Sequence, residues 1–568
     1  MNSHYEAFKE LLELRLNVSS NALQPSDWII QNTSLKNKRF SFAKHEYQID
    51  FANDKHRIVA AEKCAQIGFT EILLRWILCF LVQHQGSQAI FTQPTATDVG
   101  KFAKSRVDTC FDECAVIKRL GTGGIDSAQL KKIGTSFLNL SGTFGTRAAI
   151  SVPSDANVYD EVNFSNPKVL NQYKSRLQHS DFKLERCIST PTVPGFGVSD
   201  LVNRSDQKQV MIKCSHCGHQ QTLSWPDNVF LASNVRLGTK GEVDSDAFAK
   251  YIDQTYNYTP YIGCAKCERE LTRTWEYQEW VAKFPEKARD LDEGISGYII
   301  SQLDVAFVSA REIIKASDRR LDGYNNPQDF YNFILGKPYA GGDSMPVTDA
   351  TKILATIIMS LEKVNGTFVG LDLGNICHLV VIKDFWLPGR PVPTPIVVAT
   401  KKINRNDLET DLPAILAMYG AIYTVSDAQP YTTTVEKIAK AMPGRMSICF
   451  FGGKKPYTIA ADHIQVTANR TQMLDAVTGD LSKAQTQVAS CVEHFDEIWR
   501  HCKNLIKVKA EDEDGTIYYE YVKVNDGDDH FGYSYGYALL ARRIFYEVQP
   551  QGTTGLAPVE ISGCKVNI

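Results

Sequence analysis

A phosphate-loop-like segment between an apolar strand and a long apolar helix constrains this chain more than any other feature. From Lys63 to Thr70 it reads Lys-Cys-Ala-Gln-Ile-Gly-Phe-Thr. Gly68 permits a tight turn, with a strand predicted over 57–61 before it and a helix predicted over 71–83 after it. Such a turn directs consecutive backbone N–H groups at an anion, while a lysine neutralises it and a hydroxyl ligates Mg²⁺. The sequence therefore predicts a nucleotide site with Lys63 on the phosphates and Thr70 on Mg²⁺.

Two downstream motifs strengthen this prediction. The loop alone also fits a buried strand–turn–helix with an incidental lysine, because the usual Gly-Lys-Ser/Thr ending is missing. Asp160 and Glu161 supply the acids that a nucleotide-hydrolysing site needs. One carboxylate completes the Mg²⁺ shell, and its neighbour polarises the attacking water. Ser189 and Thr190 close another short strand, where hydroxyls are placed to sense the γ-phosphate. Taken singly, each motif also fits an ordinary turn, so only their order favours an ATPase.

Four of the fourteen cysteines have the spacing of metal ligands. They form two CxxC pairs, Cys214 with Cys217 and Cys264 with Cys267. Each pair lets two thiolates hold one ion in tetrahedral geometry, which predicts a closed, structural zinc site. With four thiolates available, His216 and His219 are expected to stay outside the coordination sphere. The remaining cysteines are scattered singly, which is typical of a reducing cytoplasm and not of a disulfide framework.

Three separated acidic positions follow in the second half of the chain. Asp372 ends a buried strand predicted over 367–373, Asp427 follows the apolar run 421–425, and the pair Asp528 and Asp529 precedes a predicted helix, 531–545. Separated carboxylates suit two Mg²⁺ or Mn²⁺ ions that bridge a scissile phosphate. Any one of these aspartates alone also fits a cap or a turn. In series they predict a metal-dependent nuclease.

The ordered motifs resemble the large terminase subunit of tailed phages, in particular the lambda-type (GpA-like) group. Members carry the phosphate-loop lysine at the front, as Lys63 stands here, then an Asp-Glu pair like Asp160-Glu161, then a Ser-Thr-Pro-Thr coupling motif like 189–192. The resemblance covers residues from about 40 to 545. It implies a P-loop (ASCE-type) ATPase domain with a zinc-binding insertion, followed by an RNase H-like nuclease domain. It also implies that Asp372, Asp427 and the Asp528/Asp529 pair are the nuclease ligands.

The resemblance assigns further residues and leaves two points open. Tyr47-Gln48 is similar to an element that contacts adenine in this family. Gln66 stands inside the loop where some relatives have an arginine, so an arginine finger would come from elsewhere, and Arg147 is the candidate, acting on a neighbouring subunit. The last helix lacks the acidic residue that often occurs in it, since Tyr533 or Ser534 stands there. The geometry of the third ligand, and the choice between Asp528 and Asp529, therefore stay open.

Length and strand–helix alternation predict an α/β chain of several domains, because 568 residues exceed a single core. The strands expected in the first half are 57–61, 88–92, 136–140, 148–152, 156–159 and 186–190. The expected divisions are an N-terminal arm or partner-binding segment (1–40), the ATPase domain (41–204), the zinc-binding insertion (205–285), the rest of the ATPase domain with a linker (286–345), the nuclease domain (346–548) and a C-terminal tail (549–568).

The resemblance implies a DNA-packaging motor that hydrolyses ATP, translocates double-stranded DNA and cuts concatemers. Its cofactors would be ATP, Mg²⁺ or Mn²⁺, and Zn²⁺; its partners would be a small terminase subunit and a portal protein, with the active form a homo-oligomeric ring in the host cell cytoplasm. The net charge, 62 basic minus 65 acidic residues, is −3, so DNA contacts must come from local basic patches. No secretory signal or membrane-spanning run is expected, since the longest apolar stretch is too short.

Two alternatives remain at this stage. A cellular helicase–nuclease of DNA repair would need helicase motifs and a second motor domain after the coupling segment, where this chain has the cysteine pairs and the acidic series. A zinc-stabilised DNA-binding scaffold with degenerate ATP and metal sites would lack both activities.

Overall fold

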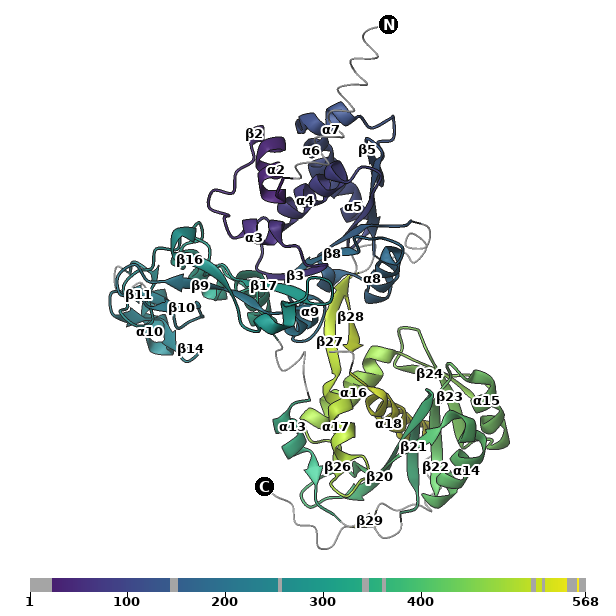
Figure 1. The fold of residues 1–568 in the computed structure, drawn as a ribbon. Coiled ribbons are helices and arrows are strands. Elements are labelled where there is room, and N and C mark those ends of the chain that lie inside the picture. The colour runs from purple at the N-terminus through teal and green to yellow at the C-terminus, as the bar shows by residue number, and fades with distance from the viewer. Residues whose placement is uncertain are drawn as a thin grey trace. The chain divides into compact units, whose positions relative to one another are not determined.

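The computed structural model describes residues 23–143, 152–253, 258–339, 347–359, 364–511, 517–523, 527–548 and 559–560. The chain divides into two compact units. One comprises Met1–Tyr339 with Glu511–Thr516, and the other Ala340–Ala510 with Ile517–Ile568. Each unit contains one large sheet, in which ten strands can be traced through the described residues (Figure 1).

The large sheet of the first unit has a central run of parallel strands. In spatial order these are β17 (Ile295–Ile300), β3 (Ile58–Lys63), β8 (Leu184–Ser189), β7 (Ala156–Asp160), β4 (Gln88–Gln93) and β6 (Ser136–Gly142). Antiparallel β5 (Leu130–Ile133) pairs with β6 at one edge. In this order β8 separates the phosphate-loop strand β3 from β7, which carries the acidic pair. That separation is the arrangement expected of an ASCE-type ATPase.

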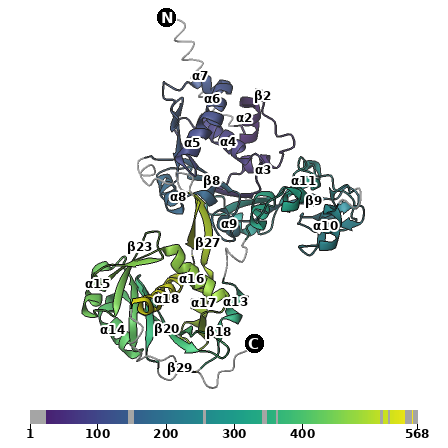
Figure 2. The same ribbon diagram turned by 180° about the vertical axis from the view of Figure 1, so that it is seen from behind.

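Helices cover both faces of this sheet (Figures 1 and 2). Val59 and Ala61 of β3 join the core made with α4 (Phe69–Gln83), whereas Ala60 joins the core made with α8 (Pro167–Lys174) and α9 (Val198–Arg204). Successive side chains of a strand point to opposite faces, so a strand covered on both sides is apolar without alternation. The long helix α4 is buried on nearly every side, which explains its continuous apolar sequence.

The sequence located most of these strands correctly. The expected strands 57–61, 88–92, 136–140, 156–159 and 186–190 correspond to β3, β4, β6, β7 and β8 with ends that differ by a residue or two. The helix after the phosphate loop begins earlier than expected, at Phe69. The strand expected at 148–152 falls almost entirely outside the described residues, as do the first 22 residues of the N-terminal segment and most of the tail.

Smaller elements complete the first unit. The helices are α2 (Pro25–Asn32), α3 (Gln48–Asn53), α5 (Ala96–Phe102), α6 (Asp108–Glu113), α7 (Ala115–Leu120), α10 (Ser245–Ile252), α11 (Ala310–Ala316) and α12 (Pro327–Asp329). The strands are β1 (Ser34–Leu35), β2 (Lys38–Arg39), β9 (Lys208–Lys213), β10 (Gln220–Gln221), β11 (Val229–Ala232), β12 (Val235–Arg236), β13 (Gly238–Thr239), β14 (Glu242–Val243), β15 (Tyr261–Ile262) and β16 (Gln278–Ala282).

The cysteine-bearing segment is continuous with the large sheet. β9 pairs with β17, and β10 and β16 both pair with β9. Beyond them lie the three-stranded sheet β12-β11-β15 and the hairpin β13-β14.

The second unit is built on a mixed sheet. Its centre runs β21 (Thr394–Asn404), β20 (Ile376–Trp386), β19 (Thr367–Asp372), β22 (Ala421–Asp427) and β23 (Met446–Phe451). The first three strands form an antiparallel meander, and β22 and β23 run parallel to β19. Further strands are β18 (Thr356–Ile357), β24 (Tyr457–Ile459), β25 (Gln465–Ala468), β26 (Gln487–Ala489) and β29 (Val559–Glu560), with a separate hairpin of β27 (Leu505–Glu511) and β28 (Ile517–Lys523). Numbered along the chain, the central order is 3-2-1-4-5, as in an RNase H-like sheet.

Helix α18 (His530–Val548) packs directly on β19, β20 and β22. The other helices of this unit are α13 (Asp349–Leu354), α14 (Leu408–Met418), α15 (Thr432–Ala441), α16 (Arg470–Ser482) and α17 (Phe495–Lys503). Gly370 makes the close approach of α18 possible, because a Cβ there would collide with backbone atoms of Ser534 and Ala538. Among the described residues, no helix combines the length and apolar character needed to cross a bilayer.

We expect Gly370→Ala to destabilise the second unit by about 1–3 kcal/mol or more, because the added methyl group forces α18 away from β19. The measurement is the thermal unfolding midpoint of the full chain, followed by circular dichroism. Gly479→Ala in α16 is the matched control: its Cβ meets nothing within 4 Å, so the change should be neutral or stabilising by about 0.5–1 kcal/mol. Equal midpoints for the two variants would contradict the role of Gly370.

Candidate nucleotide, nuclease and metal sites

The phosphate loop joins the carboxyl end of β3 to the start of α4. Gly68 precedes the helix with a left-handed φ of +81°, and a Cβ there would lie 2.8 Å from the Gln48 side chain. Gln66 is also left-handed, with φ of +62°. The first N–H groups of α4 have no partner within the helix and face the loop, as in anion-binding turns. The local fold therefore has the form that the loop sequence predicts.

Lys63 is held by the acidic pair. Its Nζ lies 2.8 Å from Glu161 Oε1, and only 7% of the Lys63 side chain is exposed. Burial alone lowers the pKa of this lysine, but the charges of Glu161 and Asp160 raise it overall. The other Glu161 oxygen, Oε2, accepts hydrogen bonds from Ser189 Oγ (3.1 Å) and the Thr190 amide (3.3 Å). Glu161 joins the loop lysine to both residues of the predicted coupling motif.

Glu161 adopts a strained backbone conformation. Its φ is +52°, in the left-handed region that non-glycine residues rarely occupy. Such strain commonly marks functional positions, where neighbouring contacts hold it in place. Here the contacts with Lys63 and Ser189 supply that constraint.

Asp160 accepts hydrogen bonds from Thr70 at the start of α4 and from Gln93, a residue that the sequence analysis did not single out. Thr70 Oγ1 donates to its Oδ1 at 3.3 Å, and Gln93 Nε2 donates to its Oδ2 at 2.8 Å. Burial, and then the charge of Glu161, raise the pKa of Asp160 to about 6. Gln93 was missed because no motif marks it. The available signal was its position at the end of β4, the strand beside β7.

Tyr47 and Gln48 brace the loop in this structure. Tyr47 Oη and Gln48 Nε2 each donate to the Ile67 carbonyl at 2.8 Å. Both residues are buried, with 4% and 2% of their surface exposed. The resemblance suggested that they contact adenine, but burial leaves almost no surface for a base in this conformation. Arg147, the candidate arginine finger, lies outside the described residues.

The acidic series of the second unit begins at the carboxyl ends of two neighbouring parallel strands. Leu371 of β19 pairs with Ser426 of β22, so Asp372 and Asp427 follow side by side. Burial, and next the charge of Asp372, raise the pKa of Asp427 to about 6. The two carboxylates are thus close enough to interact, as a shared metal site requires.

Asp529 and Asp528 differ in exposure. Asp529 is only 4% exposed, whereas Asp528 is exposed. Tyr533 lies one turn into α18, and its pKa is raised to about 12, chiefly by burial. Arg470 opposes this rise, and the charges of Asp529, Asp372 and Asp427 add to it. The charges of the buried Asp529 and of the two strand-end aspartates thus all act on one tyrosine. Tyr533 is one of the two residues, with Ser534, that stand where the resemblance leads one to expect an acid.

Two histidines that the sequence did not single out adjoin Asp372. His530 Nδ1 lies 2.8 Å from Asp372 Oδ2, and the His378 ring stacks on His530 with centroids 4.8 Å apart. His378 is the register partner of Asp372 on β20, and burial lowers its pKa to about 4. One ligand atom from each of these three residues lies within 4.8 Å of the others. The only sequence signal was that His530 ends the Asp-rich run.

The four predicted cysteines converge. Their sulfur atoms all lie within 4.8 Å of one another, with Cys214 Sγ 3.6 Å from Cys267 Sγ and Cys217 Sγ 3.7 Å from Cys264 Sγ. Four sulfurs about 2.3 Å from a central Zn²⁺ would be separated by roughly 3.8 Å, so the donor set fits this ion. His216 is exposed, and neither it nor His219 belongs to this cluster within the described residues.

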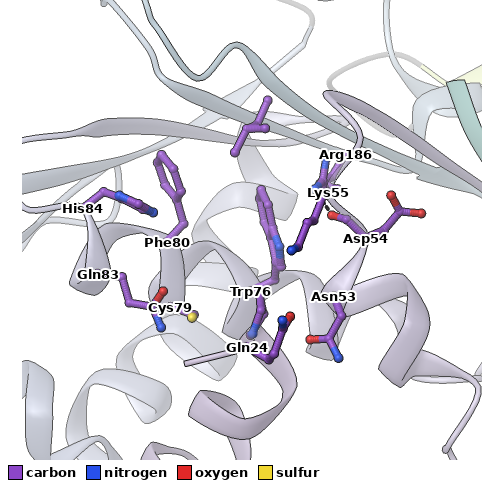
Figure 3. Close-up of a pocket in the computed structure, with 12 residues that line it drawn as sticks. Gln24, Asn53, Asp54, Lys55, Trp76, Cys79, Phe80, Gln83, His84 and Arg186 are labelled. Atoms are coloured by element: carbon purple, nitrogen blue, oxygen red, sulfur yellow. Dashed lines mark hydrogen bonds between the residues drawn. The ribbon is translucent and has the colours of Figure 1, made fainter. Parts of the chain in front are cut away.

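A cavity of about 240 Å³ lies elsewhere in the first unit (Figure 3). It is lined by Cys79 near the end of α4, by His84 just after that helix, and by Asp54 and Lys55 before β3. Trp76 and Arg186 face one another there, with the guanidinium carbon 4.3 Å from the ring centroid. The cavity adjoins the start of β3, whereas Lys63 is at its end, so it is separate from the nucleotide site.

These features define a class of protein. The first unit has a lysine at the end of β3, a hydroxyl at the start of α4, and buried Asp160 beside half-buried Glu161 at the end of β7, with β8 between β3 and β7. This arrangement is that of a phosphate-loop ATPase. Residues 44–279 match the family described as "Phage terminase large subunit gpA, ATPase domain". Over these residues the chain is similar to the ATPase domain of phage terminase large subunits, the group that its ordered motifs also resemble.

Solved structures of large terminases are also similar to the chain, at low levels. The large terminase from a thermophilic bacteriophage has 12% identity and a TM-score of 0.30, with 89% of this chain and 99% of that one covered. The large terminase nuclease from thermophilic phage G20c with bound magnesium has 13% identity and a TM-score of 0.24, covering 34% and 96%. Similarities this low establish no shared geometry. A comparison with curated proteins found no match.

Proposed function

We propose that Lys63, Thr70, Asp160 and Glu161 bind and hydrolyse ATP. The convergence of these four side chains at one edge of the sheet is the observation that carries this proposal. Mg²⁺, when bound with ATP, would neutralise charge that develops on the phosphates. Thr70 and Asp160 would hold that ion, Lys63 would bind the phosphates, and Glu161 would orient the attacking water.

Ser189 and Thr190 link the nucleotide to movement in this proposal. Both contact Glu161 Oε2 through a hydroxyl or an amide. A phosphate that draws Lys63 away from Glu161 would remove the positive charge beside this carboxylate. The hydrogen bonds from Ser189 and Thr190 to Glu161 would then change as well. Gln93, which holds Asp160, is the positioning residue of the same site.

The second unit would cleave DNA with Asp372, Asp427 and Asp529 as metal ligands. Four observations support this assignment: Asp372 and Asp427 share one sheet edge, the charge of Asp372 raises the pKa of Asp427, the charges of all three aspartates raise the pKa of Tyr533, and Asp529 is buried. Two divalent ions, when bound, would activate water and stabilise the leaving oxygen. His530 would orient Asp372 through its 2.8 Å contact. The four cysteines would hold one structural Zn²⁺.

The match of residues 44–279 to the terminase ATPase-domain family supports the proposal that the chain is the large subunit of a viral DNA-packaging terminase. We propose double-stranded concatemeric DNA as the substrate, a small terminase subunit and a portal protein as partners, and a ring of identical subunits as the active form in the host cytoplasm. An arginine from a neighbouring subunit would complete the ATP site.

Lys63→Ala should lower ATP turnover by about 100-fold or more, since the phosphates lose their buried cation. Metal-dependent plasmid cleavage should persist, because the nuclease residues lie on the other sheet. The measurements are phosphate release and agarose gels with Mn²⁺. Lys101→Ala, an exposed lysine on α5, is the control. An unchanged ATPase rate in Lys63→Ala would exclude this nucleotide site.

Asp372→Asn and Asp529→Asn should each reduce plasmid cleavage by at least about 100-fold while ATP turnover remains. Asp528→Asn is the matched control, because this neighbouring carboxylate is exposed, and it should retain most of the cleavage activity. If Asp528→Asn were the inactive variant and Asp529→Asn the active one, the third ligand would be Asp528. If wild type shows neither ATPase nor cleavage, the DNA-binding scaffold alternative holds.

The purified chain should contain one Zn²⁺ per molecule, as measured by mass spectrometry of the metal. Cys217→Ser should lose it and unfold at a lower temperature, since a closed four-thiolate site contributes directly to folding. Cys491→Ser removes an exposed cysteine outside the cluster and should keep both the ion and the stability. Zinc retained at full stoichiometry in Cys217→Ser would contradict the site.

A further inference from the structure

An exposed basic loop lies at the nuclease edge of the second sheet. Residues 452–456, Gly-Gly-Lys-Lys-Pro, leave the end of β23 and are all exposed. Asp427 of β22 is in register with Cys449 of β23. Both strands run in the same direction, so the loop begins three residues, or about 10 Å, beyond Asp427 at the edge that carries the aspartates.

The loop is fixed to its surroundings through backbone groups. The Gly452 amide donates to Ala468 O at 3.0 Å, Asn469 Nδ2 donates to Gly453 O at 3.1 Å, and the Asn469 amide donates to Pro456 O at 3.0 Å. None of these bonds uses a lysine side chain. The loop is therefore an ordered support that leaves its two ammonium groups free for a ligand.

The charges of Lys454 and Lys455 are not neutralised within the described part of the chain, where neither ammonium group has an ion-pair or hydrogen-bond partner. Other lysines of this unit do pair with carboxylates. Examples are Lys352 with Asp496, Lys401 with Glu493, Lys402 with Glu497, Lys437 with Glu409 and Lys507 with Asp475. Two exposed lysines without ion-pair partners are suited to bind the phosphates of a nucleic acid. The acidic cluster beside them would bind the scissile phosphate of the same strand through metal ions.

Arg470 links this loop to the catalytic residues. Its guanidinium carbon lies 4.8 Å from the Phe451 ring centroid and 5.7 Å from that of Tyr533. Phe451 is the last residue before the loop, and Tyr533 is the residue whose pKa responds to all three aspartates. A positive charge is thus held by stacking between the basic loop and the acidic cluster.

We propose that Lys454, Lys455 and Arg470 form the phosphate-binding surface that holds the DNA backbone at the nuclease site. This proposal rests on the proposed nuclease function and names the residues that recognise its substrate. The contacts go to backbone phosphates and are independent of base sequence, since lysine on a phosphate carries no sequence information. At about 10 Å from Asp427, the loop meets phosphates roughly three nucleotide rises of 3.4 Å from the cleaved one.

The test compares the full-length wild type with Lys454→Ala/Lys455→Ala in Mn²⁺-dependent plasmid cleavage. Each lost phosphate contact lowers the salt slope of log affinity by about 0.9, so the double variant should lose about 1.8 of slope. The same relation predicts that KM for DNA rises by about 30-fold at 0.15 M salt. The cleavage rate at saturating DNA and the ATPase rate should not change. Adding Arg470→Gln should reduce the slope by about a further 0.9.

The matched control is Lys437→Ala/Lys440→Ala. These two lysines lie in α15, which leads back toward the start of β23 at the opposite edge of the sheet, and both are paired with glutamates. Their KM and salt slope should equal those of wild type. An unchanged KM and slope in the Lys454/Lys455 variant, or a lost maximal rate with unchanged KM, would overturn the proposal while the nuclease function stands. A wild-type chain that cuts no DNA would instead remove the proposed function itself.

Discussion

Both chemical sites depend on parallel strands that end at the same edge of a sheet. In the first unit, β3, β8 and β7 bring Lys63, Ser189 and Asp160 to one edge. In the second unit, β19 and β22 do the same for Asp372 and Asp427. Parallel neighbours need long crossover connections. That requirement explains why residues that touch in space are far apart in the sequence.

The candidate nucleotide site depends on the ion pair between buried Lys63 and half-buried Glu161. A buried charge without a partner is costly, so removing one member of such a pair is strongly destabilising. Glu161 satisfies the lysine while its second oxygen is held by Ser189 and Thr190, and its backbone is strained. We infer that a triphosphate competes for Lys63 and leaves Glu161 to its remaining partners. The carboxylate of Glu161 would then connect the phosphate-binding lysine with the coupling motif, because it contacts both.

The two units use acids differently. Around Asp160 the acids are matched by a lysine, a threonine and a glutamine from the same site. Around Asp427, burial and then the charge of another carboxylate, Asp372, raise its pKa to about 6. Like charges brought together in a buried place are stabilised by metal ions. The acidic charge of the first site is therefore balanced by side chains of the protein, whereas the charge of the second is of the kind that bound metal ions would balance.

Much of the fold and of the candidate sites could be predicted from the sequence, because several apolar strands end at or next to a charged residue. Lys63, Asp372 and Asp427 lie at or just beyond the end of an apolar run, so both the strand and the residue were visible, whereas the run before Asp160 is only weakly apolar. The cysteines were visible through their spacing. Gln93, His378 and His530 were not, since a lone glutamine or histidine has no pattern of its own. Tyr47 and Gln48 were recognised, but their burial against Ile67 could not be foreseen from two adjacent letters.

The sequence by itself determined the α/β class, the loop before α4, the order of the acidic motifs and the four thiolates, because these depend on local periodicity and spacing. Tertiary structure alone decided which strands are neighbours, and hence that Glu161 meets Lys63 and that His530 meets Asp372. It also decided that Asp529 is buried and Asp528 is exposed. Strand order and the burial of one of two adjacent residues come from long-range packing, which a local pattern does not encode.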